Sequence, residues 1–334
     1  MRANKMKNVS FVVAALTAAL LSLSLVSCEG DAVHTIRVGV STVPTEPPSI
    51  ALKRFAELVG ERSGNRIKVE VYEGGVLGMD RDLIEGMLLG TVQMHMAANS
   101  PLASFVPELM IFEMPFLFKD NEHFDAVMDS QLAWEYASAL EEKGFHLLGF
   151  WSHGVRHILT PEHVINSMED LKGLKIRTME NPAHLDAFSA FGASPLPMSY
   201  SELHTALETG AIDGAEAANS NYYGNRLYEV AKNWAQVGWL HLVAPLVMSK
   251  SYYDNLPADL QKILDDTGRE VGAFERALYV KRDKELLTQL QADGVNVTYP
   301  DREPFIKAAK AVYDQWADKV GGSEKIQAII NYEY

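Results

Sequence analysis

A repeated alternation of strand-like and helix-like segments is the feature that most restricts the fold of this 334-residue chain. Residues 35–41 and 66–72 alternate apolar and polar side chains, as half-buried strands do, and each is followed by a segment with helical spacing. The same order returns further along, where predicted strands at 174–178 and 194–198 flank a predicted helix. Strands separated by helices typically form mainly parallel sheets covered by helices. The chain is therefore predicted to be an α/β protein with two halves of this kind.

A long helix is predicted near the C-terminal end. Residues 258–293 contain no proline, and their apolar side chains keep helical spacing. A helix of this length in an α/β protein could bridge two lobes. Gly268 and Gly272 are its soft points, so two helices broken near Gly268 are an equally good interpretation. Another long helix is predicted over residues 122–143.

The composition indicates a globular, acidic protein. Hydrophobic residues make up 47% of the chain, which is ample for a core. The 44 acidic residues outnumber the 30 basic ones and give a net charge of −14. A nucleic-acid partner is not expected, because a general interface of that kind needs a basic surface. The single cysteine, Cys28, excludes internal disulfides and CxxC zinc or redox sites.

The N-terminal segment resembles a bacterial lipoprotein signal. A basic start precedes an almost wholly apolar or small run at residues 9–26. The run ends in Leu-Val-Ser-Cys, which resembles a lipobox and implies cleavage before Cys28 and lipidation of that residue. We expect a signal peptide at 1–27, a tether at 28–34, and a body held at a membrane of the bacterial envelope, in the periplasm. The alternative is a signal anchor with an incidental cysteine.

The common catalytic motifs do not occur in the sequence: it contains no GxSxG, HExxH, P-loop or GxGxxG pattern. His153 and His157 are four residues apart but lie in a strand-like stretch, where that spacing does not put them on one helical face. No metal site, cofactor or enzymatic activity is therefore predicted. An α/β protein with two halves and no visible catalytic residues has the profile of a binding protein whose ligand lies between two lobes.

Several motifs, in order along the chain, resemble the solute receptors of tripartite ATP-independent periplasmic (TRAP) transporters. The most specific is Leu-Lys-Gly-Leu-Lys-Ile-Arg, which ends at Arg177. The resemblance covers nearly all of the chain after the signal segment. The other matching segments are 77–78, 107–109, 115–118, 192–198, 206–216 and 256–261.

This resemblance implies a two-lobed, periplasmic-binding-protein-like fold with a ligand cleft and a long helix that bridges the lobes. Lobe I would comprise residues 35–153 and 243–282, and lobe II residues 154–242 and 283–334. It implies a receptor that captures a small organic carboxylate and delivers it to the membrane permease subunits of a TRAP transporter. A periplasmic helical-repeat lipoprotein is a further partner that the resemblance suggests.

The resemblance also assigns the main ligand contact. The arginine of the Lys-x-Arg strand, here Arg177, would form a two-point salt bridge with the ligand carboxylate. A planar guanidinium matches a carboxylate with two donors, which lysine does not. Arg156 resembles a second family arginine, which would contact the ligand or a buried acid in the cleft. Glu216, in the segment Asp-Gly-Ala-Glu, is a further candidate.

Polar residues after predicted strands give three more candidates. Asn99 and Ser100 follow the third strand at its carboxyl end, where parallel sheets place ligands. Glu73 follows the second strand in the same way and could accept hydrogen bonds from ligand hydroxyls. The alternative for Asn99 and Ser100 is loop capping, and for Glu73 a solvated turn.

The chain departs from the family pattern at Ala217, where many members carry an asparagine that bonds the ligand. Asn219 is the next amide along and is kept as a candidate, although it comes late for a simple substitution. Trp239 stands where many members carry a histidine or polar residue. Together with further aromatic residues it raises the hypothesis of a less polar cleft, suited to an acid with an apolar or aromatic group. Packing in the core is the alternative. The further aromatic residues are Phe150, Trp151, Tyr222 and Tyr223.

Three other functions compete with a TRAP receptor. A ligand-binding sensor lipoprotein or an ABC-type receptor would keep the binding fold and change the partner. An envelope hydrolase would need a positioned nucleophile and base, which the sequence does not offer.

Overall fold

The computed structural model describes residues 33–334. The predicted signal peptide and Cys28 lie outside these residues. The described part contains a nine-stranded sheet. Eight of its strands follow the order β2-β1-β3-β8-β4-β7-β5-β6, and the ninth, β9, pairs with β8. The strands are β1 (His34–Gly39), β2 (Ile67–Tyr72), β3 (Met94–Met96), β4 (Phe145–Thr160), β5 (Lys175–Thr178), β6 (Ser194–Pro197), β7 (Gly214–Ala217), β8 (Asn233–Ser249) and β9 (Asn296–Thr298).

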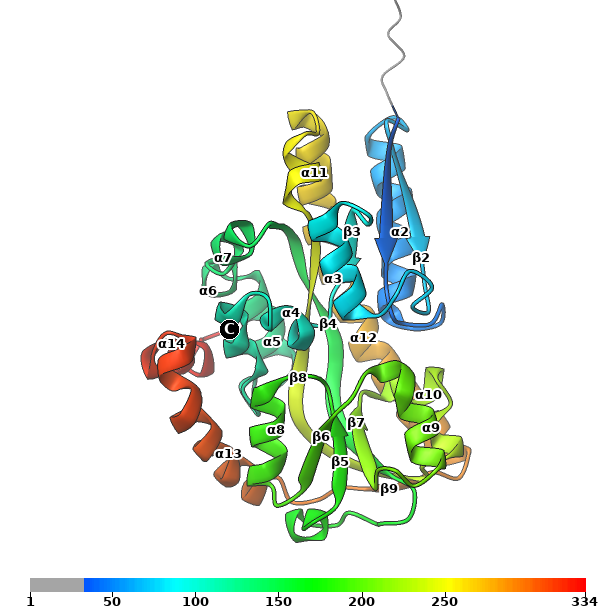
Figure 1. Ribbon diagram of the computed structural model, residues 1–334, viewed down its shortest axis with the longest axis vertical. Coiled ribbons are helices and arrows are strands. Elements are labelled where there is room, and N and C mark those ends of the chain that lie inside the picture. The colour runs from blue at the N-terminus through cyan, green and yellow to red at the C-terminus, as the bar shows by residue number, and fades with distance from the viewer. Residues whose placement is uncertain (1–32) are drawn as a thin grey trace, which may run out of the picture. The chain divides into compact units, whose positions relative to one another are not determined.

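The sheet is parallel toward its flanks and antiparallel in its centre. The pairs β1–β3, β5–β6, β5–β7 and β8–β9 are parallel, as the βα alternation predicts. The two longest strands, β4 and β8, pair antiparallel along almost their whole length and run through both halves of the sheet (Figure 1). Residues 145–152 and 243–249 pair beside β1, β2 and β3, in what we call lobe I. Residues 155–160 and 233–241 pair beside β5, β6, β7 and β9, in lobe II.

The two lobes join at an irregularity in this central pair. The register shifts between Ser152 and Val155, which marks a β-bulge. Gly154 lies in the bulge with φ 78°, and a Cβ there would come within 2.3 Å of the Tyr279 ring and 2.9 Å of Ala218 Cβ. Both the left-handed backbone and the lack of space therefore require glycine at this position.

Helices surround the sheet of each lobe. In Figure 1, α2, α3 and α11 accompany the strands of lobe I, and α8, α9 and α10 accompany those of lobe II. None of the helices within residues 33–334 combines the length and the apolar character that a membrane crossing requires. The helices are α2 (Pro47–Arg62), α3 (Asp80–Leu89), α4 (Asn99–Ala103), α5 (Asn121–Asp129), α6 (Gln131–Trp134), α7 (Ala137–Glu142), α8 (Pro182–Ala190), α9 (Leu203–Glu208), α10 (Asn219–Gly224), α11 (Lys250–Asp254), α12 (Ala258–Ala292), α13 (Glu303–Trp316) and α14 (Ser323–Ile330). The 3₁₀ segments are η1 (Pro107–Glu113), η2 (Met168–Leu171), η3 (Tyr200–Glu202), η4 (Leu227–Glu229) and η5 (Ala317–Val320).

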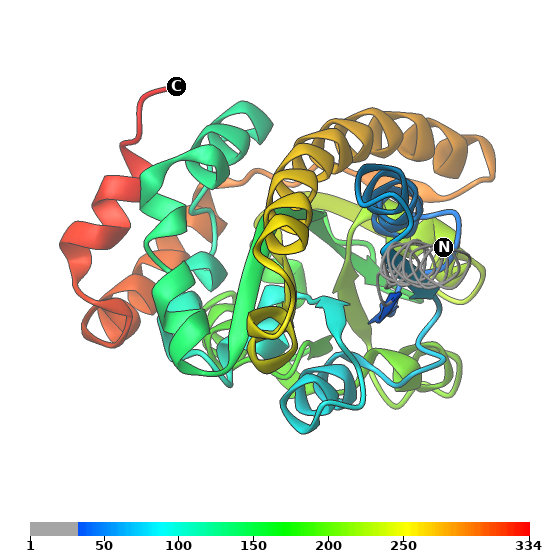
Figure 2. The ribbon, with the colours of Figure 1, turned by 90° about the horizontal axis from the view of Figure 1, so that it is seen from above.

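The long helix α12 is continuous over 35 residues, which decides between the two interpretations of the sequence. Figure 2 shows it as one curved helix, and it packs against α2 of lobe I and α10 of lobe II. Its two glycines are places of close approach to β4 rather than breaks. A Cβ on Gly268 would lie 2.6 Å from the Leu148 carbonyl oxygen, and one on Gly272 would lie 2.8 Å from the Trp151 ring. The Trp151 indole also donates to the Gly268 carbonyl at 3.1 Å.

The long helix predicted over residues 122–143 is wrong. The structure has three short helices there, α5, α6 and α7. Ser130 breaks the first from the second with an extended backbone, φ −84° and ψ 164°. Its hydroxyl donates to the Val127 carbonyl at 2.7 Å, so the side chain satisfies a group at the end of α5. The apolar segment before these helices contains α4 and η1.

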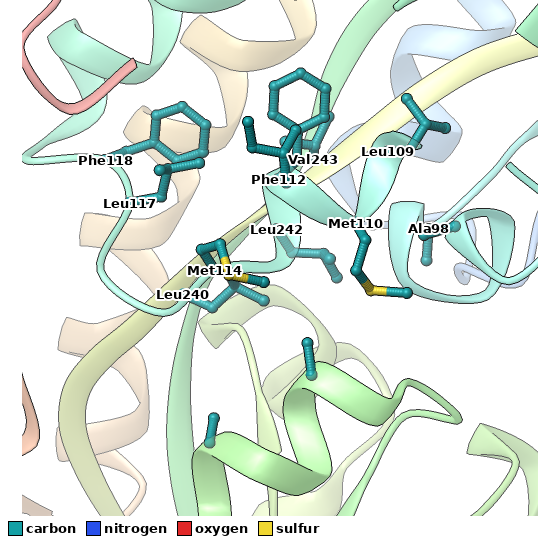
Figure 3. Packing of buried hydrophobic residues seen from close by; sticks show 14 of the residues in the cluster. Ala98, Leu109, Met110, Phe112, Met114, Leu117, Phe118, Leu240, Leu242 and Val243 are labelled. Carbon is teal, nitrogen blue, oxygen red and sulfur yellow. The ribbon is translucent and has the colours of Figure 1, made fainter. Parts of the chain in front are cut away.

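The largest apolar cluster lies over β8 and joins the two lobes. Figure 3 shows residues of η1 and the following loop packed beside Leu240, Leu242 and Val243 of β8. Leu242 and Ala98, which belong to this cluster, also line a cavity between the lobes. The core therefore forms part of the wall of this cavity.

Candidate ligand-binding site

A cavity of about 320 Å³ lies where the two lobes meet. Its wall combines residues that follow β1, the start of α3 and His153 from lobe I with residues of β4, β5 and α10 and the segment after β6 from lobe II. The charged residues and the histidine that line it are Glu46, Asp80, Arg81, Asp82, His153, Arg156, Arg177 and Glu180.

A second hollow, of about 460 Å³, lies on lobe II around residues 161–163 and 207–213. Most of the residues that line it are exposed or half-buried, and they include three acidic side chains. We assign the ligand site to the first cavity, because buried charged groups converge there.

Arg177 presents a guanidinium to this cavity. It is only 2% exposed, and its Nε and Nη2 both donate to the Met198 carbonyl, at 2.9 and 2.7 Å. The third nitrogen, Nη1, has no hydrogen-bond acceptor within residues 33–334. It lies 3.5 Å from Glu216 Oε1, a charge contact without hydrogen-bond geometry. Burial lowers the pKa of Arg177, an effect that Glu216 opposes, but a guanidinium stays protonated. Arg177 is therefore a buried cation whose Nη1 can still donate a hydrogen bond.

Arg156 is held by protein groups on all three nitrogens. Nε donates to Glu216 Oε2 at 2.7 Å, Nη1 to Asn221 Oδ1 at 2.8 Å, and Nη2 to the Glu216 carbonyl at 3.2 Å. The sequence left open whether Arg156 contacts the ligand or a buried acid, and the structure places it on the buried acid Glu216. Burial opposes the charge of Glu216, but Arg156 and then Arg177 outweigh it and lower the pKa of that carboxyl. We call Arg156, Arg177 and Glu216 the arginine cluster.

The lobe I side of the cavity is rich in acceptors. Asp80 Oδ1 accepts from the Ala98 backbone N–H at 3.1 Å and contacts His95 Nε2 at 3.2 Å. Burial raises the pKa of Asp80, but the bond from His95 and its charge outweigh burial and lower it. His153 Nε2 has no hydrogen-bond partner in the described part of the chain, and burial lowers the pKa of His153 to about 4. His153 is therefore neutral at pH 7 and can donate or accept one hydrogen bond to a ligand.

Two more groups of the wall were not predicted from the sequence. The buried hydroxyl of Tyr200 has no partner among the described residues, and Arg177 lies over its ring at 5.8 Å. Glu46 is buried and accepts hydrogen bonds from lobe II. Ser41 and Thr42, which also line the cavity, come shortly after the end of β1 at Gly39, so the strand-end rule that selected Asn99 could have selected them.

Asn99 and Ser100 do not line the cavity. Both side chains are bound to the buried carboxylate of Glu113: Asn99 Nδ2 donates to Oε1 at 2.6 Å, and the Ser100 hydroxyl donates to Oε2. His184 Nε2 from α8 lies 2.5 Å from the same Oε2. We call Asn99, Ser100, Glu113 and His184 the Glu113 cluster. The ligand role of Asn99 and Ser100 stays a prediction, but these contacts are those of a structural cluster.

The remaining predicted residues also lie away from the cavity wall. Glu73 pairs with Lys53 at 3.0 Å. Asn219 accepts from the Trp234 indole at 2.7 Å and lies beside α12. The amide that does line the cavity is Asn221, two residues further along α10, which faces Arg156 while Ala217 supplies only a buried methyl group.

The aromatic residues near the site are core residues, as the alternative interpretation predicts. Trp239 is fully buried, with its ring edge-on to His184 and Phe188 at 4.8 and 5.1 Å. Tyr222 stacks on Trp234 at 4.2 Å. None of Trp239, Phe150, Trp151, Tyr222 and Tyr223 lines the cavity. These aromatics therefore do not form the cavity wall, and a role for Trp239 in ligand binding stays a prediction.

Within residues 33–334 no group of three or more histidine, cysteine or acidic side chains could hold a metal ion. A buried guanidinium and further polar groups from both lobes around one cavity are the features of a site for a small anion with further hydrogen-bonding groups.

Comparison with known protein families gives a match over residues 38–319 to the bacterial extracellular solute-binding protein family 7, the DctP family. The chain belongs to this family. DctP-family proteins are binding proteins of the bacterial cell exterior, and the TRAP resemblance of the sequence motifs agrees with this membership.

Relatives in the family match over most of the chain. A solute-binding protein of Verminephrobacter eiseniae is 34% identical over 288 residues, which are 86% of this chain and 86% of that protein. A TRAP periplasmic solute-binding protein of Polaromonas, solved with D-erythronate, has a TM-score of 0.87 and 30% identity, covering 90% of this chain and 99% of that one. A TRAP protein of Bradyrhizobium, solved with galacturonate, has a TM-score of 0.86 and 30% identity, covering 90% and 100%. The two-lobed α/β fold with its ligand cleft is therefore confirmed, as is the function of a receptor for small organic acids.

Proposed function

We propose that this DctP-family receptor captures a hydroxylated monocarboxylate, of the sugar-acid class, and delivers it to a TRAP membrane permease. The single observation that carries the proposal is that Arg177 lines the cavity while its buried Nη1 lacks a hydrogen-bond acceptor within residues 33–334. A carboxylate oxygen is the acceptor that suits it, since charge-assisted bonds to a guanidinium are short and strong.

Polar groups from both lobes favour a ligand with hydroxyl groups over one with an apolar tail. His153 Nε2 and the Tyr200 hydroxyl are both buried and lack partners in the described residues. Asp80 adds a carboxylate acceptor to the same cavity, and Glu46 adds a further acid whose oxygens already accept hydrogen bonds from the protein. A second carboxylate on the ligand would meet these acids and be repelled, whereas hydroxyls would find acceptors. The structural relatives solved with D-erythronate and galacturonate support the same class.

Calorimetric titration with a panel of acids tests this proposal. We expect at least one of D-galacturonate, D-glucuronate, D-galactonate and D-erythronate to bind with a Kd in the micromolar range or below, and succinate and phenylacetate to bind far more weakly. Native mass spectrometry of the protein purified from cells would identify a retained ligand directly. A preference for the dicarboxylate or the aromatic acid would contradict the proposal.

We propose lipid anchoring through Cys28 as well. The basis is the lipobox-like sequence alone, because Cys28 lies outside the described residues. Cys28→Ala should move the protein from the detergent phase to the aqueous phase in a partition experiment, since stable anchoring depends on the acyl chains. A variant that stays in the detergent phase would contradict this.

The partners and lobe boundaries are proposals of the same kind. TRAP permease subunits are the expected partners, with a periplasmic helical-repeat lipoprotein as a further one. The proposed lobes are 35–153 with 243–282, and 154–242 with 283–334, so that α12 crosses between them. A permease gene beside this one would favour transport over the sensor and ABC-receptor alternatives. A hydrolase function has no support from the cavity, which combines ligand-holding groups without a paired nucleophile and base among its described residues.

A further inference from the structure

Glu46 stands out among the acids of the cavity because its partners come from the other lobe. It is the residue before α2 in lobe I and is 2% exposed. Its own loop fixes it in place: the Val43 N–H donates to Oε1 at 3.0 Å, and the Glu46 N–H donates to the Val43 carbonyl at 3.0 Å. The carboxylate is therefore held in one orientation before any contact with lobe II is made.

Helix α10 of lobe II and Asn225, the residue that follows it, supply the remaining hydrogen bonds. Asn221 Nδ2 donates to Glu46 Oε2, and Asn225 Nδ2 donates to Oε1 at 3.3 Å. Gly224 lies between the two asparagines, and a Cβ there would come within 3.1 Å of Val43 and 3.3 Å of Glu46 side-chain carbons. The helix thus packs directly on the Glu46 loop, and a larger residue at position 224 would crowd this contact.

The same asparagine reaches the ligand end of the cavity. Asn221 Oδ1 accepts from Arg156 Nη1 at 2.8 Å, and Arg156 in turn holds Glu216, the carboxylate beside Arg177. A continuous chain of polar contacts therefore runs from lobe I through α10 to the guanidinium that faces the cavity. Asn221 can satisfy both neighbours at once because its amide offers an acceptor to Arg156 and a donor to Glu46.

We propose that Glu46, Asn221 and Asn225 form an interlobe latch that holds the cavity closed and positions Arg156 in the closed state. This inference rests on the proposed function only for its binding readout. Burial raises the pKa of Glu46 to about 7, while the bonds from Val43, Asn221 and Asn225 lower it. Burying this carboxylate is costly without those donors. Glu46 is therefore stabilised in its buried position only when α10 packs against the Glu46 loop, so closure of the lobes and formation of these hydrogen bonds depend on each other.

A distance measurement without ligand tests the latch independently of the ligand class. The intact chain with Cys28→Ser, Glu61→Cys and Glu208→Cys carries spin labels on exposed positions of α2 and α9, because Cys28 is the only cysteine in the sequence. We expect the ligand-free protein to populate a short, closed distance, and Glu46→Ala to lower that population at least threefold. Identical distance distributions with and without Glu46→Ala would overturn the latch, whichever acids the protein binds.

Binding gives the second readout. With D-galacturonate as the probe, Glu46→Ala should raise Kd at least tenfold, and Glu46→Gln, which keeps one acceptor oxygen, should raise it less. Glu57→Ala, an exposed acid on the same helix, is the matched control and should leave Kd unchanged. A thermal unfolding curve with one transition confirms that each variant is folded. If wild-type protein binds none of the acids, the proposed function fails while the distance measurement still decides the latch. A Glu46→Ala Kd within twofold of a measurable wild-type value would overturn the positioning role.

Discussion

The arginine cluster and the Glu113 cluster are both buried and polar, but only the arginine cluster contributes residues to the cavity wall: Arg156 and Arg177 line the cavity, whereas Glu216 lies behind them. In the arginine cluster two guanidinium groups share one carboxylate, Glu216, and the Arg177 contact to it is 3.5 Å long. In the Glu113 cluster one carboxylate is surrounded by His184, Asn99 and Ser100 at hydrogen-bond distance. The arginine cluster therefore differs from the Glu113 cluster in two ways that suit a ligand: it has one more positive than negative side chain, and it reaches the cavity wall.

Removing the carboxylate of the Glu113 cluster gives the largest expected change. Glu113→Ala leaves the donors of Asn99 and Ser100 without an acceptor and removes the partner of His184. The free energy of unfolding should therefore fall by roughly 3–5 kcal/mol. Urea unfolding measures this. Glu113→Gln is the milder control and should lose less. Affinity for the acid should stay close to wild type when measured well below the unfolding midpoint, and a selective loss of affinity would place this cluster in the ligand site after all.

Arg177→Ala should have the opposite profile. Losing a desolvated charge pair with the ligand typically costs roughly 2–5 kcal/mol, or about 30- to several-thousand-fold in affinity. Stability should fall only by about 1 kcal/mol, since the main bonds that Arg177 makes within the protein are the two to the Met198 carbonyl. Arg177→Lys should recover part of the affinity, because it restores the charge without the two-donor geometry. Calorimetry with near-native affinity for the alanine variant would contradict the assignment.

Two buried acids, Glu46 and Glu216, should affect the pH dependence of stability in opposite directions. Burial raises the pKa of Glu46 to about 7, above its value in the unfolded chain. Between these two values the folded state binds more protons than the unfolded state, so stability falls as pH rises. Glu46→Gln removes this pH-dependent contribution. The difference in stability between Glu46→Gln and wild type should therefore shift in favour of the variant from pH 5 to pH 8, by at most about 3 kcal/mol. For Glu216 the sign is reversed: its lowered pKa gives stability above its ordinary pKa that is lost as pH falls.

Urea unfolding of the wild type and Glu46→Gln at both pH values measures the difference. Parallel pH profiles for the two proteins would show that Glu46 is charged in the folded and unfolded states alike.

The smallest effect on stability and affinity is expected from substitution of Trp239. Its ring packs edge-on against His184 of the Glu113 cluster, and its indole N–H has no partner within residues 33–334. Trp239→Phe keeps an aromatic ring and removes an unsatisfied donor, so we expect a loss of only about 1 kcal/mol in stability. Affinity should stay within twofold. A tenfold loss measured by calorimetry would restore Trp239 as a ligand contact.

The sequence predicts the order of strands and helices well because each element carries its own periodicity. It does not decide whether α12 is continuous, since the reason for Gly268 and Gly272 is the close approach of β4, more than a hundred residues earlier. It overlooks the break at Ser130, where one side chain bonds the end of α5. Local pattern is informative where the cause is local, and these causes are not.

The site shows the same limit. Arg177 is found because a specific motif surrounds it, whereas Asn99 and Ser100 satisfy a general strand-end rule and lie off the cavity wall. The sequence favours Asn219, two residues before Asn221, and only the orientation of α10 tells the two apart. Glu46 follows β1 in a short loop with no motif, and its partners come from residues 221 and 225. Contacts between distant segments decide these roles.

The most direct test of a carboxylate at Arg177 compares an acid with its uncharged analogue on two proteins. Calorimetry would give the Kd of D-galacturonate and of D-galactose for the wild type and for Arg177→Ala. We expect the wild type to prefer the acid at least 100-fold and Arg177→Ala to reduce that preference to less than tenfold, because the guanidinium is what reads the carboxylate. A preference for the acid that is equally strong in both proteins would mean that the carboxylate binds elsewhere, and would contradict the account.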